Sequence, residues 1–226
     1  MLRHIVIAGA TGEVGKELLG LACALPQTEV RALVRRPKTV PASAAIETLF
    51  DYEDPLAYDR LFSTIPCDVL LIALGTTTAK SGNQGLLRVD RDYPIALIDA
   101  LERHHPQAFI GFCSSVGADQ PRGNYLRAKA AVEERLRHSP LAVTVVRPSL
   151  LLSQRQEFRL VEHMGAAFAP LWLWAVSKFA PSSEFAWKFA PIHVSTVARA
   201  LLNTTLGMSH AQHVTLQGLS LHQAGE

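Results

Sequence analysis

The sequence has few cysteines and no cluster of metal-ligating side chains. Its three cysteines, Cys23, Cys67 and Cys113, are odd in number and widely separated in a chain of 226 residues. It contains neither a CxxC pair nor an HExxH segment, so we expect no disulfide scaffold and no metal site of these types. We interpret the cysteines as buried thiols in a reducing compartment and expect a cytoplasmic protein.

An excess of one charge and a long apolar run are also missing. The net charge is +2 with the charged residues scattered, which predicts no nucleic-acid-binding surface. The apolar start IVIAGA is too short for the core of a secretory signal. The longest apolar and aromatic tract, residues 166–180, is interrupted by Pro170 and Lys178. We therefore expect no transmembrane segment.

Short apolar runs alternate with segments of helical spacing over the first 146 residues. Strands are expected at 4–10, 29–34, 46–50, 68–74, 108–113 and 143–146, and helices at 13–25, 55–64, 89–104 and 125–137. A further helix at 195–206 and a last strand at 213–216 are expected near the end. The strands are apolar throughout, which indicates burial on both faces of a sheet. The predicted fold class is α/β, a doubly wound parallel sheet in one domain spanning 1–226.

The rhythm changes after Pro148, where all three tryptophans fall between residues 150 and 190. Residues 150–210 are expected to form a small substrate cap over the carboxyl edge of the sheet. Core packing is the default interpretation of the tract LWLWAVSKFAPSSEFAWKF (171–189). Its aromatic side chains are alternatively the lining of an apolar substrate pocket, or a patch for a second copy of the chain, another protein or a membrane surface.

A glycine-rich segment, GATGEVG (9–15), joins the first predicted strand to the first predicted helix. Gly9 would permit a tight turn, Gly12 a close approach of the backbone to a pyrophosphate, and Gly15 close packing of helix on strand. The helix N-terminus would offer free amides and the positive end of its dipole to phosphate. A purely structural turn is the alternative. The other loop residues assigned to cofactor binding are Thr11, Glu13 and Val14.

The end of the second strand distinguishes between the two nicotinamide dinucleotides. An acidic residue about 20 positions after the glycine loop would bind the ribose hydroxyls of NAD. The segment ALVRRP (32–37) instead carries Arg35 and Arg36. A guanidinium can bind a ribose 2′-phosphate through two hydrogen bonds, so NADP(H) is the expected cofactor. A solvated basic turn is the alternative, and Arg35 is the better candidate of the two.

Two further segments at strand ends are candidates for contact with the cofactor. Asp51, after the third strand, could accept a hydrogen bond from the adenine amino group, or it could cap the helix that begins near Pro55. Leu74, Gly75 and Thr76 end the fourth strand, where a small residue would let the cofactor's riboses lie against the backbone. An ordinary glycine between strand and loop is the alternative there.

A tyrosine and a lysine stand four residues apart after the fifth strand. This spacing puts Tyr125 and Lys129 on one face of the predicted helix. A nearby ammonium would lower the pKa of the phenol from about 10, and the phenol could then exchange a proton with a carbonyl or alcohol oxygen. Ser114 and Ser115 end the strand, and we prefer Ser115 for orienting that oxygen. A lysine packed beside a half-buried tyrosine, with two loop-capping serines, is the structural alternative.

These residues give the chain a family likeness. GATGEVG, the serines of CSSVGAD (113–119) and the Tyr125–Lys129 pair resemble the atypical NAD(P)-binding branch of the short-chain dehydrogenase/reductase superfamily. LGTTTAKSGNQGLLRVDRDY (74–93), RPSLLLSQRQEFR (147–159) and PIHVSTVARALLN (191–203) look like the Tat-interacting-protein oxidoreductase-like family. One departure is a shorter separation between serine and tyrosine than is usual among the short, single-domain enzymes.

The resemblance implies a Rossmann fold, bound NADP(H) and a catalytic site of Ser115, Tyr125 and Lys129. It further implies that the loop of Arg147, Pro148 and Ser149 lies near the nicotinamide. Val89 and Asp90, at the start of the helix after the fourth strand, are expected to line the site as well.

Two functions remain open at this point. One is an NADPH-dependent oxidoreductase that reduces a small, apolar carbonyl compound with Tyr125 as the proton donor. The other is a non-enzymatic NADPH-binding sensor that acts through a protein partner. His104 and His105 end a predicted helix, where a cation complements the helix dipole, and we assign them no catalytic role.

Overall fold

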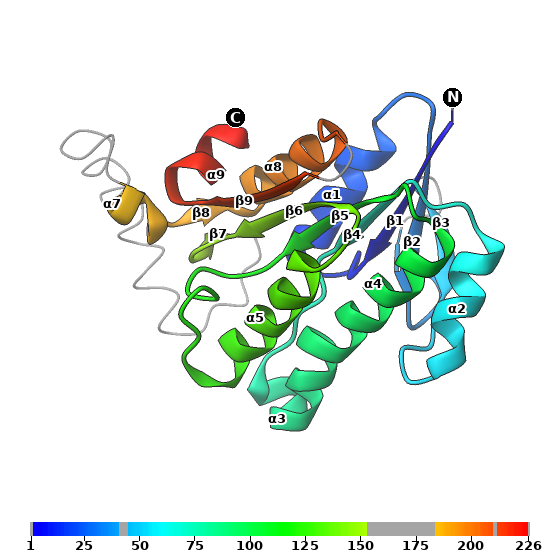
Figure 1. Ribbon diagram of the computed structural model, residues 1–226, viewed down its shortest axis with the longest axis horizontal. Helices are drawn as coiled ribbons and strands as arrows, with labels where there is room; N and C mark the ends of the chain where they lie inside the picture. The colour runs from blue at the N-terminus through cyan, green and yellow to red at the C-terminus, as the bar shows by residue number, and fades with distance from the viewer. Residues whose placement is uncertain (1, 41–44, 153–183, 210–211, 226) are drawn as a thin grey trace.

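A seven-stranded parallel sheet forms the centre of the computed structural model, which describes all residues except 1, 41–44, 153–183, 210–211 and 226 (Figure 1). The strand order is β3-β2-β1-β4-β5-β6-β9, and every neighbouring pair is parallel. The strands are β1 (Arg3–Ala8), β2 (Thr28–Val34), β3 (Ile46–Leu49), β4 (Val69–Ile72), β5 (Phe109–Cys113), β6 (Ala142–Arg147) and β9 (His213–Gln217). The predicted doubly wound parallel sheet is confirmed.

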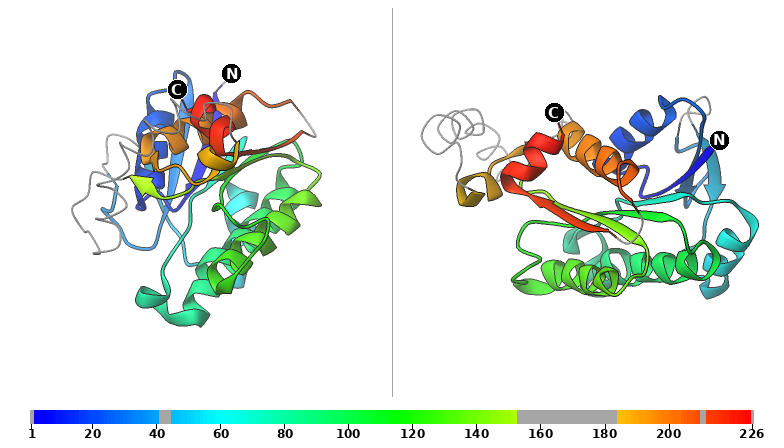
Figure 2. Two further views of the ribbon diagram at one scale, coloured as in Figure 1. Left: turned by 90° about the vertical axis from the view of Figure 1, so that its left-hand side faces the viewer. Right: turned by 45° about the horizontal axis from the view of Figure 1, so that its top comes forward.

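Helices cover both faces of this sheet, as Figures 1 and 2 show. One face carries α1 (Glu13–Cys23), α8 (Val194–Leu206) and α9 (Gly218–Ala224), and the other carries α2 (Pro55–Thr64), α4 (Tyr93–His104) and α5 (Gly123–Arg137). Each face has its own cluster of buried apolar side chains. Burial on both sides explains the apolar strands: all four residues of β4, VLLI, are buried.

The segment between β4 and α4 is more helical than the sequence indicates. The helix predicted at 89–104 is preceded by α3 (Thr78–Leu87) and begins with a π-helical turn, η1 (Arg88–Asp92). Gly82 interrupts α3 with a φ of +66°. The polar, glycine-containing sequence TAKSGNQG has no apolar periodicity, so nothing in it predicts this helix.

The chain after β6 forms a second, two-stranded sheet from β7 (Leu151–Leu152) and β8 (Ile192–His193), beside the short helix α7 (Glu184–Lys188). Trp187 of α7 packs against His222 of α9, with their rings 4.8 Å apart. Trp172 and Trp174 lie outside the described residues, as does most of the expected cap. The single domain with a cap therefore stays a prediction.

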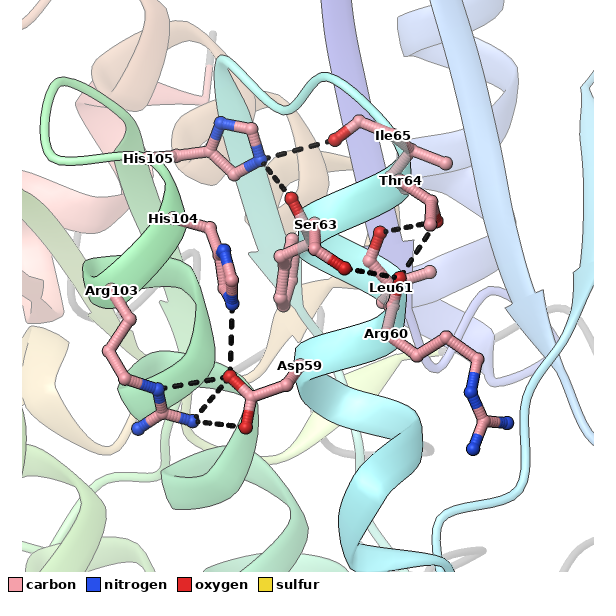
Figure 3. Close-up of polar contacts among 10 residues, drawn as sticks. Asp59, Arg60, Leu61, Ser63, Thr64, Ile65, Arg103, His104 and His105 are labelled. Carbon is pink, nitrogen blue, oxygen red and sulfur yellow. Dashed lines mark hydrogen bonds and ion pairs between the residues drawn. The ribbon is translucent and has the colours of Figure 1, made fainter.

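Polar contacts join α4 to α2 away from the carboxyl edge of the sheet (Figure 3). Asp59 of α2 accepts hydrogen bonds from Arg103 and pairs with His104, and these bonds lower the pKa of its carboxyl group. His105 Nε2 lies 2.9 and 3.1 Å from the carbonyl oxygens of Phe62 and Ile65. Carbonyls only accept, so Nε2 must carry the proton. His105 thus satisfies carbonyls at the C-terminal end of α2.

Candidate active site

The candidate site lies where the sheet reverses its winding. From β1 the chain builds outwards to β2 and β3, and it then returns to add β4, β5, β6 and β9 on the other side. Open α/β sheets bind ligands at the carboxyl ends of the strands at such a switch point. A cleft of about 160 Å³ is found here, lined by Gly9, Thr11, Gly12, Leu33, Val34, Arg35, Tyr52, Ala73, Leu74, Gly75, Val89 and Tyr93.

Two glycines of the loop after β1 are required by close backbone contacts. Gly9 has a φ of +90°, and a Cβ atom on it would lie 2.5 Å from the carbonyl oxygen of Ala73. A Cβ atom on Gly15 would lie 2.0 Å from the carbonyl oxygen of Gly9. Gly12 is the N-cap of α1 and makes no side-chain cap. Glu13 and Val14 are the first two residues of α1, and the N-terminus of a helix is a site that favours phosphate.

The cleft continues past Arg35 into a larger, open cavity of about 700 Å³. Arg35, Tyr52 and Tyr93 line both spaces. Arg35 is exposed and has no ion-pair partner among the described residues, whereas Arg36 lines neither space. Of the two arginines, only Arg35 is therefore positioned beside the cleft.

Asp51 lines the larger cavity, and its second role predicted from the sequence is wrong. Asp54, and not Asp51, caps α2, because Asp54 Oδ1 accepts a hydrogen bond of 2.9 Å from the amide of Leu56. Asp51 Oδ1 instead accepts from the amide of Glu53, also at 2.9 Å. Asp51 thereby stabilises the turn between β3 and α2.

Lys129 is buried beneath the cleft and ties two strand ends together. Its ammonium donates to the carbonyl oxygens of Leu74, at 2.9 Å, and of Cys113, at 3.4 Å. It also lies 3.0 Å from Asp90 Oδ1. The Lys129 side chain is 3% exposed and that of Asp90 is completely buried. Asp90 Oδ2 accepts from the amide of Thr76, so the segment after β4 is held from both sides.

Tyr125 lies beside Lys129 as the spacing predicts, but the pKa of its phenol shifts in the direction opposite to the one expected from the sequence. Its ring centroid is 5.8 Å from the Lys129 ammonium, and 39% of the residue is exposed. Burial raises the pKa of Tyr125 above its ordinary value, and Lys129 and a hydrogen bond with Ser115 only partly offset this rise. The net lowering of the pKa expected from the sequence is therefore wrong, because partial burial outweighs the ammonium's effect and the Asp90 carboxylate also raises the pKa.

The two serines after β5 have different partners. Ser114 is buried and donates to Glu133 Oε1, and Glu133 also accepts from the guanidinium of Arg147. Ser115 is less buried and interacts with Tyr125. Ser115 is thus the serine beside the tyrosine, while Ser114 belongs to a buried network. The preference for Ser115 as the residue that orients the substrate oxygen stays a prediction.

Residues 147–149 contact the serine loop mainly through backbone. The Arg147 side chain is committed to Glu133 and also reaches Gln217 of β9. The carbonyl oxygen of Pro148 accepts from the amide of Val116 at 2.9 Å. Ser149 donates to the carbonyl oxygen of Ala190. The side chains of Arg147 and Ser149 are therefore occupied within the fold, and their predicted closeness to a nicotinamide stays a prediction.

Sequence reasoning missed the aromatic wall of the cleft. Tyr52 and Tyr93 pack with ring centroids 5.1 Å apart. Tyr93 donates to the Glu53 carboxylate, which also pairs with Arg88. Burial, followed by this carboxylate, raises the pKa of Tyr93 to about 12. Val89 and Tyr93 both line the cleft, and their spacing of four residues on a predicted helix was the available signal.

A glycine loop that opens the first helix at the switch point of a parallel sheet defines a dinucleotide-binding domain. Comparison with known families agrees. Residues 9–167 match the family described as NAD(P)H-binding, and the chain belongs to this family. The expected Rossmann fold and NAD(P) binding are thereby confirmed, whereas the choice of NADP over NAD stays a prediction.

Relatives extend over most of the chain. The protein HTATIP2 of Rattus norvegicus is 29% identical over 231 residues, covering 99% of this chain and 90% of its own length. This relative matches the Tat-interacting-protein likeness stated above. The mitochondrial protein fmp52 of Emericella nidulans is 28% identical over 176 residues, covering 74% of this chain and 75% of its own. The cytoplasmic location expected here stays a prediction.

Solved structures share the fold. The oxidoreductase ylbE of Lactococcus lactis superimposes with a TM-score of 0.69 at 19% identity, covering 98% of this chain and 94% of the other. A putative NAD-dependent epimerase/dehydratase from Bacillus halodurans gives 0.66 at 19% identity, covering 99% and 98%. Within the described part of the chain, no helix is long and apolar enough to span a membrane. The same residues contain no cluster of side chains suited to a metal.

Proposed function

We propose that this protein is an NADPH-dependent reductase of small carbonyl compounds, in which Tyr125 donates the proton. The observation that carries this proposal is the meeting of Ser115, Tyr125 and Lys129 at the carboxyl end of β5. This end of the sheet also carries the cleft built from the glycine loop and residues 73–75. A proton donor and a dinucleotide cleft at one sheet edge are what hydride transfer to a carbonyl needs.

The cofactor is proposed to lie along the cleft. Gly12 and the first amides of α1 would bind its diphosphate. Arg35, exposed and without an ion-pair partner in the described part of the chain, would bind the adenosine 2′-phosphate. Gly75 lines the cleft and would let a ribose lie against the backbone.

The chemistry follows from the protonated phenol. A bound nicotinamide cofactor would supply the hydride that the carbonyl carbon of the substrate accepts. Tyr125 gives its proton to the carbonyl oxygen as negative charge develops there, and solvent returns a proton to the phenolate. Ser115, beside Tyr125, would orient that oxygen by a hydrogen bond.

Replacing Tyr125 by phenylalanine tests the proposal. Loss of the proton donor is expected to slow NADPH oxidation about a hundredfold, the lower end for general acid catalysis, with NADPH affinity unchanged. The assay mixes purified protein with NADPH and a panel of aldehydes, ketones and quinones, and cofactor oxidation is followed. Equal turnover by Tyr125→Phe and the native chain would contradict the mechanism. Tight NADPH binding without any oxidation by the native chain would favour the sensor function instead.

A second prediction concerns the choice of cofactor. Arg35→Gln is expected to weaken NADPH binding about tenfold, the equivalent of one charge-assisted hydrogen bond, and to leave NADH binding nearly unchanged. Arg36→Gln is the matched control, because this neighbouring arginine is exposed and lines neither cavity. Dissociation constants for both cofactors would be measured by calorimetry. An equal loss for NADPH and NADH would show that Arg35 does not contact a 2′-phosphate.

A further inference from the structure

A buried ion pair joins Lys129 of the proposed active site to Asp90. Asp90 comes from the π-helical turn η1 and Lys129 from α5, and neither charge reaches solvent. Burying two charges costs free energy unless their remaining bonding positions are filled. Most of them are filled here, because Asp90 Oδ2 accepts from the amide of Thr76 and Lys129 donates to two carbonyls, whereas Asp90 Oδ1 has no partner among the described residues besides the Lys129 ammonium. The pair is therefore a built feature of the site.

The partners of Lys129 account for all of its hydrogen-bonding capacity. An ammonium has three donors. Two point to the carbonyl oxygens of Leu74 and Cys113, and the carboxylate of Asp90, 3.0 Å away, attracts the third. The contact with Tyr125 is only that of a charge 5.8 Å from the ring centroid. Lys129 thus donates hydrogen bonds to the ends of β4 and β5.

The charges around Tyr125 act in opposite directions. Lys129 and the hydroxyl of Ser115 favour the phenolate, while Asp90 and Cys113 oppose it. Cys113 carries a thiol whose pKa burial raises to about 11, so this group is neutral at working pH. The pKa of Lys129 is raised although its burial lowers it, and the Asp90 carboxylate is one of the groups that raise it, so its charge persists. The balance near the phenol is therefore set by one ammonium and the carboxylate that pairs with it.

We propose that Asp90 is a positioning residue that holds the Lys129 ammonium on the strand ends, so that Tyr125 keeps its proton and the site works in the direction of carbonyl reduction. This inference rests on the proposed function. In that direction the Tyr125 O–H bond breaks as the substrate oxygen gains the proton and its carbon gains the hydride of NADPH. The reverse oxidation needs a phenolate, which the pairing of Lys129 with Asp90 disfavours at neutral pH.

The π-helical turn around Asp90 places one residue at the cleft and another beside Lys129. Asp90 lies in the middle of η1, whose wider turn is a form of helix often found at functional sites. Val89, the residue before it, lines the cleft, as does Tyr93 at the start of α4. The same turn therefore presents an apolar wall to the cleft and a buried carboxylate to Lys129.

Asp90→Asn tests the inference without substrate or cofactor. The ring-carbon signals of the four tyrosines would be followed by NMR against pH, and Tyr125→Phe would assign the signal of Tyr125. Removing the carboxylate leaves an unneutralised ammonium beside the phenol. The pKa of Tyr125 is expected to fall by about 1 to 3 units. If the pKa of Tyr125 in Asp90→Asn equals or exceeds that of the native chain, the inference is overturned. This holds whether or not the protein turns out to be a reductase.

Two further variants sharpen the test. Asp92→Asn removes an exposed carboxylate that pairs with Arg91 on the same helical turn, and it should leave the titration of Tyr125 in place. A double variant, Asp90→Asn with Lys129→Met, removes both charges and should restore the native titration. This double variant decides the matter alone if Asp90→Asn does not fold. A rise of more than about 1 unit in it would show that Lys129 acts on Tyr125 as an unpaired charge, against the inference.

Discussion

Glu133→Ala is expected to lower the free energy of unfolding by about 3 to 5 kcal/mol. Glu133 is buried on α5 and accepts hydrogen bonds from the hydroxyl of Ser114 and the guanidinium of Arg147. Arg147, which is itself only 15% exposed, would then lose the carboxylate that neutralises it. Removing one partner of a buried ion pair leaves an uncompensated charge, and this is the source of the large cost.

The neighbouring residue provides a matched control for this prediction. Glu134 has the same side chain on the same helix but is 57% exposed and pairs with Arg137 at the surface. Glu134→Ala is expected to change stability by no more than about 0.5 kcal/mol. Urea unfolding of both variants, with equal denaturant slopes, would measure the difference. Similar losses in the two variants would show that the buried network does not determine the effect, since alanine has a higher helix propensity than glutamate.

Much of the fold can be predicted because its elements depend on local signals. The strands are apolar throughout since both faces are covered, and this pattern is visible without knowing which strand pairs with which. The helix α2 begins and ends where predicted, because Asp54 and Pro55 form a favourable start. The helix α3 has no such signal. Its place is fixed by contacts with η1, which follows it directly, and with α5, which lies far along the chain.

The features of the site also differ in whether a local sequence pattern predicts them. The meeting of Tyr125 with Lys129 follows from a spacing of four residues on one helix, and the glycine loop from its place between strand and helix. The pairing of Lys129 with Asp90 joins two separate helices, so no local pattern indicates it. The sign of the Tyr125 pKa shift depends on burial and on that carboxylate, and for this reason the prediction from the lysine alone was wrong.

Gly15→Ala is expected to cost about 3 kcal/mol of stability and to weaken NADPH binding at the same time. A Cβ atom at this position would lie 2.0 Å from the carbonyl oxygen of Gly9 and 2.7 Å from its carbonyl carbon. These are backbone atoms of the loop after β1, so no flexible side chain can move aside. Relief requires α1 to shift away from β1, and overpacking of this kind costs about 1 to 3 kcal/mol or more.

Gly20→Ala separates this clash from the general effect of adding a methyl group to α1. Gly20 lies on the exposed side of the same helix, and a Cβ atom there would meet nothing within 4 Å. This variant should gain about 0.4 to 1 kcal/mol, because alanine loses less backbone entropy than glycine on folding. Thermal unfolding with and without NADPH would compare the two. A cofactor-induced stabilisation that is lost in Gly15→Ala and kept in Gly20→Ala would connect the spacing between helix and loop to cofactor binding. If both variants kept it, the loop could bind the dinucleotide without this close packing, and Gly15 would serve stability alone.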